Sequence, residues 1–271
     1  MARRWCVRVA LLFALPLLAA AQTAQKPYEP VVGQAGKDAV WVPTSAAMVE
    51  KMLDHAKLTP QDFVVDLGSG DGRTIIAAAR RGARGLGVEF NGDLVELARR
   101  QAAAAGLSDK ASFQQGDMYQ ADISKATVLA LFLLPSNIEK LLPKFLALPP
   151  GTRIVANTFW VNEWTPDDTQ TLAEGCDSWC TSHLFIVPAK VDGRWQVSEG
   201  GVVTLTQKFQ IVEGSYTPPD GGTPVPVKGR LRGNQITVTL GPSEFQGTVA
   251  GNTVEGIDKS DGEKFIATRI Q

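Results

Sequence analysis

Between residues 62 and 158, short apolar runs alternate with segments whose apolar residues recur every three or four positions. A short apolar run is typical of a buried strand, and the longer period is typical of a helix packed on one face. The apolar runs predict strands at 63–67, 85–90, 111–115, 126–134 and 153–158. The periodic segments predict helices at 74–81, 93–105 and 137–145, and a further helix begins after Thr44-Ser45. This alternation predicts an α/β fold, a doubly wound parallel sheet with helices on both faces.

The pattern changes after residue 166. Residues 184–190 and 194–198 predict two strands of a hairpin that turns at Asp192-Gly193. From residue 200 onward, short alternating runs are separated by Gly, Pro, Asn and Asp, and residues 214–226 predict a long loop. Such a pattern is typical of a small all-β domain, either a barrel or a meander. We therefore expect an α/β domain at 41–198 and a small all-β domain at 199–271.

The N-terminus carries a targeting pattern. Basic residues precede a short apolar stretch that ends at Ala19-Ala20-Ala21, which predicts a cleavable signal peptide at 1–21. The apolar stretch is shorter than the ~20 residues that span a bilayer, so we expect no stable membrane span after cleavage. The expected location is periplasmic or secreted, with an uncleaved N-terminal anchor as the alternative. Residues 22–40, rich in Pro, Gly, Gln and Lys, predict a linker.

Composition narrows the function only slightly. The chain has 271 residues, of which 44% are hydrophobic and 20% are charged, as in ordinary globular proteins. Its formal net charge of −1 gives no electrostatic indication of a nucleic-acid partner. In an oxidising compartment Cys176 and Cys180 favour a disulfide, and two free thiols are the alternative. We expect no metal site, because His183 lies near the cysteines but a closed zinc site needs a fourth ligand.

The segment Asp66-Leu67-Gly68-Ser69-Gly70-Asp71-Gly72 joins a predicted strand to a predicted helix. Glycine allows the positive φ angles and the close ligand approach that such a turn needs, and the N–H groups of the helix start favour an anionic or electron-rich group. A dinucleotide site would have a third glycine at position 73, which is Arg73. The observed spacing instead resembles the first motif of the class I S-adenosylmethionine (SAM)-dependent methyltransferases, which implies a Rossmann-like sheet and SAM as cofactor.

Acidic residues end the next two predicted strands, where a ligand at the glycine turn would lie. Glu89 can accept hydrogen bonds from both ribose hydroxyls. Asp117 can accept one from the adenine amino group, and Met118 can pack on the ring. Thr44 is a candidate for the methionine carboxylate, or else a helix cap. The candidate cofactor-binding residues are Thr44, Asp66, Gly68, Gly70, Gly72, Glu89, Asp117 and Met118.

A closer resemblance rests on Trp41-Val42-Pro43-Thr44, on Val49-Glu50-Lys51-Met52-Leu53 and on the glycine turn. These segments resemble the mitochondrial lysine methyltransferases that modify the ATP synthase c subunit and the adenine nucleotide translocase. Leu133-Leu134-Pro135-Ser136 and Val187-Pro188-Ala189-Lys190 are similar to a group of exported bacterial relatives. The resemblance covers roughly residues 40–166. It implies the fold, the cofactor and a methyl acceptor, for which protein lysine is a candidate.

Methyl transfer is an in-line displacement in which alignment supplies much of the acceleration, so we expect no catalytic dyad. The candidate substrate-side residues are Asn157, Trp160 and Trp164, with core or interdomain packing as the alternative for the tryptophans. The acid or Asn that amino methyltransferases carry after the fourth strand is absent at Leu134-Pro135-Ser136. Two functional alternatives remain: a non-catalytic protein that binds SAM or a nucleoside, and an envelope interaction protein that retains the fold.

Overall fold

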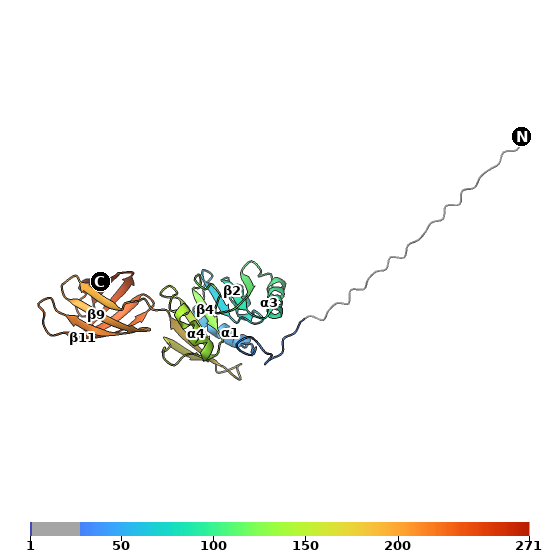
Figure 1. Cartoon of the computed structure of the whole chain (residues 1–271), viewed down its shortest axis with the longest axis horizontal. Helices are drawn as coiled ribbons and strands as arrows, with labels where there is room; N and C mark the ends of the chain where they lie inside the picture. The colour runs from blue at the N-terminus through green and yellow to red at the C-terminus, as the bar shows by residue number, and fades with distance from the viewer. Residues whose placement is uncertain (2–27, 271) are drawn as a thin grey trace.

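The computed structural model describes Met1 and residues 28–270, and it contains an α/β domain followed by a separate β-barrel (Figure 1). Apart from Met1, the predicted signal peptide at 1–21 lies outside the described residues. In the part of the chain that is described, no helix combines the length and apolar character needed to cross a membrane.

The α/β domain is built on a seven-stranded sheet with the order β3-β2-β1-β4-β5-β7-β6. The five neighbours β3, β2, β1, β4 and β5 run parallel to one another, whereas β7 is antiparallel to both β5 and β6. The strands are β1 (Phe63–Leu67), β2 (Arg84–Glu89), β3 (Ala111–Gln115), β4 (Val128–Leu131), β5 (Arg153–Asn157), β6 (Asp168–Thr171) and β7 (Thr181–Ile186). The strand order reverses between β1 and β4, which is where ligands bind in open α/β sheets. The predicted doubly wound fold is confirmed.

Helices cover both faces of this sheet. Apolar residues of α1 (Ala46–His55), α2 (Arg73–Arg80) and α3 (Gly92–Ala104) belong to one core, and those of α4 (Pro135–Phe145) belong to a second. Ser45 caps α1, because its Oγ accepts a hydrogen bond from the Met48 N–H at 3.2 Å. The alanines of α2 are buried and small, so this helix can lie close to the sheet.

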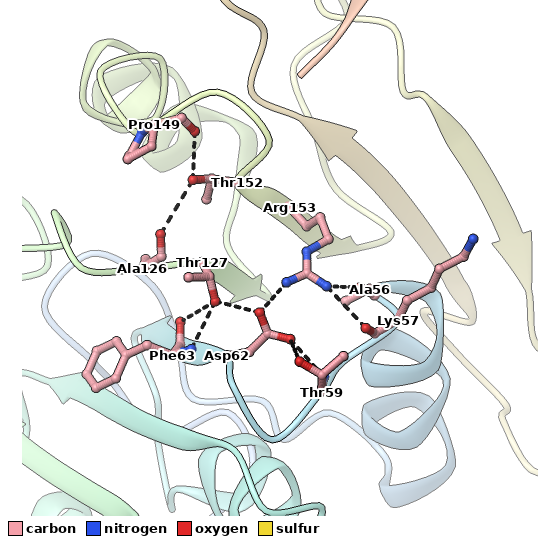
Figure 2. Close-up of polar contacts among 10 residues, drawn as sticks. All are labelled: Ala56, Lys57, Thr59, Asp62, Phe63, Ala126, Thr127, Pro149, Thr152 and Arg153. Carbon is pink, nitrogen blue, oxygen red and sulfur yellow. Dashed lines mark hydrogen bonds and ion pairs between the residues drawn. The ribbon is translucent and has the colours of Figure 1, made fainter. Parts of the chain in front are cut away.

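A polar network joins residues at the amino ends of the neighbouring strands β1, β4 and β5 (Figure 2). The glycine turn follows the carboxyl end of β1. Asp62 Oδ1 accepts a hydrogen bond from Thr127 Oγ1 at 2.7 Å and forms an ion pair with Arg153. Asp62 Oδ2 accepts a hydrogen bond from the Thr59 N–H at 2.8 Å. Arg153 also donates to the carbonyl of Ala56 at 2.8 Å, just beyond α1. The network therefore fixes α1 against β1, β4 and β5.

The C-terminal unit is a closed barrel in which neighbouring strands run antiparallel, in the order β10-β11-β12-β13-β14-β15-β8-β9. The strands are β8 (Gly193–Val197), β9 (Val202–Lys208), β10 (Ile211–Thr217), β11 (Val225–Arg232), β12 (Gln235–Leu240), β13 (Ser243–Ala250), β14 (Thr253–Asp258) and β15 (Lys264–Ile270). Its core is filled by side chains such as Trp195, Val212 and Leu231. The predicted small all-β domain is confirmed as a barrel.

Two local predictions in this region are wrong. The predicted hairpin at Asp192-Gly193 does not form, because β7 pairs with β5 and β6 of the sheet while β8 pairs with β9 and β15 of the barrel. The barrel therefore begins at Gly193, six residues before the predicted boundary at 199. The loop expected over 214–226 is shorter, because β10 extends to Thr217 and β11 starts at Val225. Local turn residues did not reveal that Trp195 is buried inside the barrel.

The barrel packs against the α/β domain through aromatic and polar contacts. The rings of Trp164 and Phe209 stack with centroids 5.3 Å apart. Gln210 Nε2 donates a hydrogen bond to the carbonyl of Thr165 at 2.6 Å. Arg230 pairs at 2.8 Å with Asp167, whose side chain is only 2% exposed. The two domains thus share a contact made of a ring stack, a hydrogen bond and an ion pair in which Asp167 is buried and Arg230 is partly exposed.

Candidate functional site

A pocket lies at the carboxyl ends of β1, β2 and β4, next to the point where the strand order reverses. Seven of the eight predicted cofactor-binding residues line it: Thr44, Asp66, Gly68, Gly70, Glu89, Asp117 and Met118. Residues from four separate parts of the sequence therefore meet at one place, as the parallel sheet requires.

The glycine turn wraps closely around the end of β2. The N–H groups of Gly68 and Ser69 both donate to the carbonyl of Val88, at 2.8 and 3.1 Å. Gly70 has a φ of +54°, and a Cβ there would lie 2.6 Å from Nε1 of Trp41. Both the backbone conformation and the packing of Trp41 therefore require glycine at position 70.

Gly72 has a packing role at the start of α2. It does not line the pocket, and its φ is +81° at the N-cap of α2. A Cβ at this position would lie 2.6 Å from Phe113 Cε1 and 2.7 Å from Ala98 Cβ. Gly72 thus allows α2 to pack closely against β3 and α3, and its contact with the cofactor stays a prediction.

The carboxylates of Glu89 and Asp117 are held in place by backbone groups. Glu89 accepts from the N–H of Gly70 at 3.0 Å and from that of Asn91 at 2.9 Å, one bond to each oxygen. Asp117 Oδ1 accepts from the Tyr119 N–H at 2.9 Å. A carboxylate oxygen can accept two hydrogen bonds, so both side chains keep acceptor capacity for a ligand.

Asp66 is the most buried of the acidic residues on the pocket wall, with 6% of its surface exposed. Burial raises its pKa to about 7; a hydrogen bond with Thr74 opposes the rise, and the charges of Glu89 and Asp71 add to it. A cation in the pocket would favour the ionised carboxylate. Together with Glu89 and Asp117, Asp66 makes a wall that suits a ligand with positive charge and hydroxyl groups.

Part of the predicted linker belongs to this site. Residues 34–40 line the pocket, and a small hairpin forms because Gly33 N–H donates to Trp41 O and Trp41 N–H to Gln34 O, each at 2.9 Å. Lys37 Nζ lies 2.7 Å from Asp117 Oδ2. The linker prediction is therefore wrong for 34–40. Glycine-rich composition describes local propensity, whereas the contact with Asp117 spans 80 residues.

Sequence reasoning also missed pocket residues that follow β4. Phe132 and Asn137 line the pocket, and Asn137 is 2% exposed. Among the described residues, Asn137 Nδ2 and Ser69 Oγ are buried side-chain atoms without a hydrogen-bond partner. Both residues lie on the pocket wall, so a polar ligand could satisfy them. The signal available in the sequence was that Ser69 and Phe132 lie at or just after the carboxyl ends of predicted strands and that Asn137 begins the helix predicted after the fourth strand.

The predicted substrate-side residues do not line the pocket. Asn157 is 1% exposed at the end of β5, where its Oδ1 accepts from Thr158 Oγ1 at 3.1 Å. Trp160 stacks on Phe185 with centroids 3.9 Å apart, and Trp164, also 1% exposed, stacks on Phe209. The contacts of both tryptophans are those of the alternative, core and interdomain packing, which suits large apolar rings, and a substrate-side role stays a prediction.

The two cysteines of the α/β domain form a disulfide. Cys176 and Cys180 are joined by an S–S bond of 2.06 Å, so the favoured alternative is confirmed and the free-thiol alternative is wrong. Across the described residues, no three His, Cys, Asp or Glu side chains are grouped so that they could hold a metal ion.

Similarity to known proteins agrees with this geometry. Residues 66–168 match the family described as the ANTKMT methyltransferase domain. A protein-lysine N-methyltransferase of Saccharolobus islandicus is 38% identical over 138 residues, which are 50% of this chain and 86% of that protein. The adenine nucleotide translocase lysine N-methyltransferase of Mus musculus is 37% identical over 139 residues, 51% of this chain and 59% of the mouse protein. This chain thus covers less than two thirds of the length of the mouse relative.

A solved structure is also similar. It is described as an RNA methyltransferase from Salinibacter ruber in complex with S-adenosyl-L-homocysteine, and it is 45% identical with a TM-score of 0.52. The similarity covers 55% of this chain and 96% of that one. Its bound ligand is the demethylated product of SAM, which has the ribose, the adenine and the α-ammonium group that a wall of carboxylates suits. The chain belongs to the ANTKMT family of class I methyltransferases and is a SAM-dependent methyltransferase.

Proposed function

We propose that this protein transfers a methyl group from SAM to the side-chain amine of a lysine in another protein. One observation carries the proposal: the pocket lined by Asp66, Glu89 and Asp117 is also lined, just beyond β4, by the uncharged ring of Phe132. Carboxylates suit the cofactor, while an uncharged end suits an amine that must lose its proton before it reacts. Relatives named as lysine methyltransferases support the same acceptor class.

Within this proposal each carboxylate binds a different part of the cofactor. Glu89 binds the ribose hydroxyls, because its two oxygens are held side by side by the N–H groups of Gly70 and Asn91. Asp117 accepts from the adenine amino group, and Met118 packs beside it. Asp66 stabilises the cationic amino-acid part of SAM, and Thr44 binds its carboxylate at the mouth of the pocket. Gly68 and Gly70 allow the backbone to approach.

The acceptor side needs no strong base. Bound SAM supplies an electrophilic methyl group on a sulfonium, and the amine lone pair forms the new N–C bond as the C–S bond breaks. A protonated lysine has no free lone pair, so it must first release a proton to water. Desolvation by apolar residues such as Phe132 and Leu133 lowers the pKa of an ammonium group and favours that release. The chain's contribution is then alignment of the two reactants.

RNA is the second candidate acceptor, favoured by the similarity to the RNA methyltransferase of Salinibacter ruber. Affinity for nucleic acid depends largely on Lys and Arg contacts with phosphates. The formal net charge of −1 and the acidic pocket wall give little support for such contacts. A purely binding role is not favoured, because the relatives are named as enzymes.

We also propose that the reaction takes place outside the cytoplasm. The Cys176–Cys180 disulfide supports an oxidising compartment, and the N-terminal pattern of basic and apolar residues supports export. The proposal requires a source of SAM in that compartment.

The decisive experiment incubates the full chain with SAM that carries a radiolabelled methyl group and an envelope extract. Label that protease removes and ribonuclease leaves, and that mass spectrometry assigns to lysine, would support the proposal. Label that ribonuclease removes would overturn it in favour of RNA. No label at all, despite calorimetric binding of SAM, would contradict an acceptor in the envelope.

A matched pair of variants tests the cofactor assignment by calorimetry. Glu89→Gln keeps the size of the side chain but loses the charge, and we expect SAM to bind at least about tenfold more weakly, because hydrogen bonds to charged groups are worth about 1.5–3 kcal/mol. Glu96→Gln changes an exposed glutamate on α3 and serves as the control. Equal affinities for the two variants would contradict the role given to Glu89.

A further inference from the structure

Three aromatic rings from distant parts of the sequence meet beside the pocket. Phe132, just after β4, stacks on Phe159, just after β5, with centroids 5.9 Å apart and an interplanar angle of 1°. Phe132 also contacts Trp179, with centroids 5.7 Å apart and the rings tilted by 57°. Phe132 lines the cofactor pocket, whereas Phe159 and Trp179 do not. The aromatic trio therefore reaches from the pocket wall at Phe132 to the exposed ring of Trp179.

Trp179 lies in the connection between β6 and β7, inside the loop closed by the Cys176–Cys180 disulfide. Its side chain is part of an exposed surface, with 41% of the residue accessible, and its φ is +58°. A large ring that is left exposed in an unfavourable backbone conformation has a cost in stability, which suggests a use outside the core. The cross-link limits the conformations of the loop and so holds Trp179 near Phe132.

The surroundings of the trio favour a positively charged chain. Glu174 and Asp177 are exposed in the same connection as Trp179. Aromatic faces attract alkylammonium groups and also pack against the methylenes that precede them. A lysine side chain has both parts. Phe132 then contacts the chain near the reacting nitrogen, while Trp179 contacts it nearer the surface.

We propose that Phe132, Phe159 and Trp179 form the acceptor-binding wall of this enzyme, specific for an amine on an aliphatic chain, and that the Cys176–Cys180 disulfide positions Trp179 in it. This inference rests on the proposed function for the identity of the acceptor. It assigns Trp179 as a specificity-determining residue, and it connects the disulfide to acceptor binding rather than to stability alone. It also replaces Trp160, which is partly buried in the core, and Trp164, which is buried, as the aromatic contacts of the acceptor.

The test uses the full chain with hexalysine peptide as the acceptor. For Trp179→Ala we expect the KM for hexalysine to rise about tenfold, which corresponds to a lost cation–π contact, while kcat and the Kd for S-adenosylhomocysteine stay nearly unchanged. Trp179→Phe should recover most of the loss, because it keeps an aromatic face. The double variant Cys176→Ser/Cys180→Ser should raise the KM in the same direction but less. Ile266→Ala, an exposed position on the barrel, is the matched control.

Calorimetry with hexalysine on the protein saturated with S-adenosylhomocysteine separates this inference from the proposed function. If hexalysine binds in a Trp179-dependent way but receives no methyl group, the lysine methyltransferase proposal fails and the acceptor wall stands. If hexalysine is methylated and Trp179→Ala leaves both KM and affinity at the level of Ile266→Ala, the acceptor wall is refuted. A fall in cofactor affinity equal to the fall in acceptor affinity would also overturn it, because Trp179 would then act on the cofactor pocket.

Discussion

Lys37 donates a hydrogen bond to Asp117 across the mouth of the cofactor pocket, with 2.7 Å between Nζ and Oδ2. The hydrogen bond to Asp117 raises the pKa of Lys37, and the same bond lowers the pKa of Asp117. Lys37 Nζ also lies 5.2 Å from the centre of the Phe90 ring. Lys37, from the hairpin at 33–41, thus donates a hydrogen bond to the same carboxylate that we propose as the acceptor for the adenine amino group.

Replacement of Lys37 by Met should strengthen cofactor binding. SAM carries a net positive charge, so loss of the ammonium group removes both a competitor for Asp117 and a repulsion. Both partners are partly exposed, and such pairs contribute little, so we expect a gain of about two- to fivefold in affinity. Calorimetry measures the gain, which should be larger for SAM than for S-adenosylhomocysteine, whose ammonium and carboxylate charges cancel. Weaker binding of both would instead make Lys37 part of the binding site.

Asp66→Asn should stabilise the protein without ligand and weaken its affinity for SAM. Burial raises the pKa of Asp66 to about 7 in the folded state, from 3.8. The folded protein therefore binds one more proton between these values, and stability falls as the pH rises through them. At about 1.36 kcal/mol per unit, the total loss is about 4 kcal/mol.

Urea unfolding of the two proteins at pH 4 and pH 8 measures this effect of Asp66. The variant should gain stability relative to the natural protein at pH 8 and little at pH 4, while calorimetry shows a loss of SAM affinity. A pH-independent difference in stability would show that the charge of Asp66 is not its cause.

Trp164→Ala should destabilise the protein without altering acceptor binding. Trp164 is 1% exposed and lies between Phe185 and Phe209, so its removal leaves a cavity where the two domains meet. Large-to-small changes of this kind cost about 3–5 kcal/mol. Trp179→Ala, the matched change at an exposed ring, should cost less than about 1 kcal/mol. Trp164→Ala should lower the free energy of unfolding and leave the KM for hexalysine unchanged. Trp179→Ala should raise that KM and leave the free energy of unfolding nearly unchanged.

Asp62→Asn should destabilise the network of Figure 2 in a pH-dependent way. Burial alone would raise the pKa of Asp62, but hydrogen bonds from Thr127 and Thr59 and the charge of Arg153 outweigh it and lower the pKa. Its stabilising effect is present above the unfolded value of 3.8 and is lost as the pH falls through the folded value. At pH 7 we expect a loss of about 2–3 kcal/mol.

Chemical denaturation as a function of pH tests the role of Asp62. The difference between Asp62→Asn and the natural protein should shrink as the pH falls below 3.8. Asp54→Asn is the control, because Asp54 also pairs with an arginine, Arg81, but its side chain is 68% exposed. An exposed pair contributes at most about 1 kcal/mol. If Asp62→Asn and Asp54→Asn lost equal free energy of unfolding, the burial of the Asp62–Arg153 pair would not explain its larger contribution.

That seven of the eight candidate cofactor-binding residues line one pocket follows from the sequence. The ends of parallel strands meet at one edge of a sheet, so a glycine turn after β1 and acids after β2 and β3 had to converge. The aromatic trio that we propose for the acceptor could not be predicted, because its rings come from segments after β4 and β5 and from a disulfide-closed loop. Trp160, Trp164 and Trp179 are equally apolar in the sequence, and only their packing separates the exposed Trp179 from the partly buried Trp160 and the buried Trp164.

By itself, the sequence determined the strands β1 to β5 and the helices α1 to α4 of the α/β domain, where the glycine turn lies and which cofactor it suits. These features depend on local periodicity and on the fixed direction of parallel strands. Only the tertiary structure decided that Lys37 meets Asp117, that β8 closes a barrel and that Trp179 rather than Trp164 lies exposed next to Phe132. Such contacts join residues far apart in the chain. They depend on burial and charge in the folded state, and local propensity does not determine them.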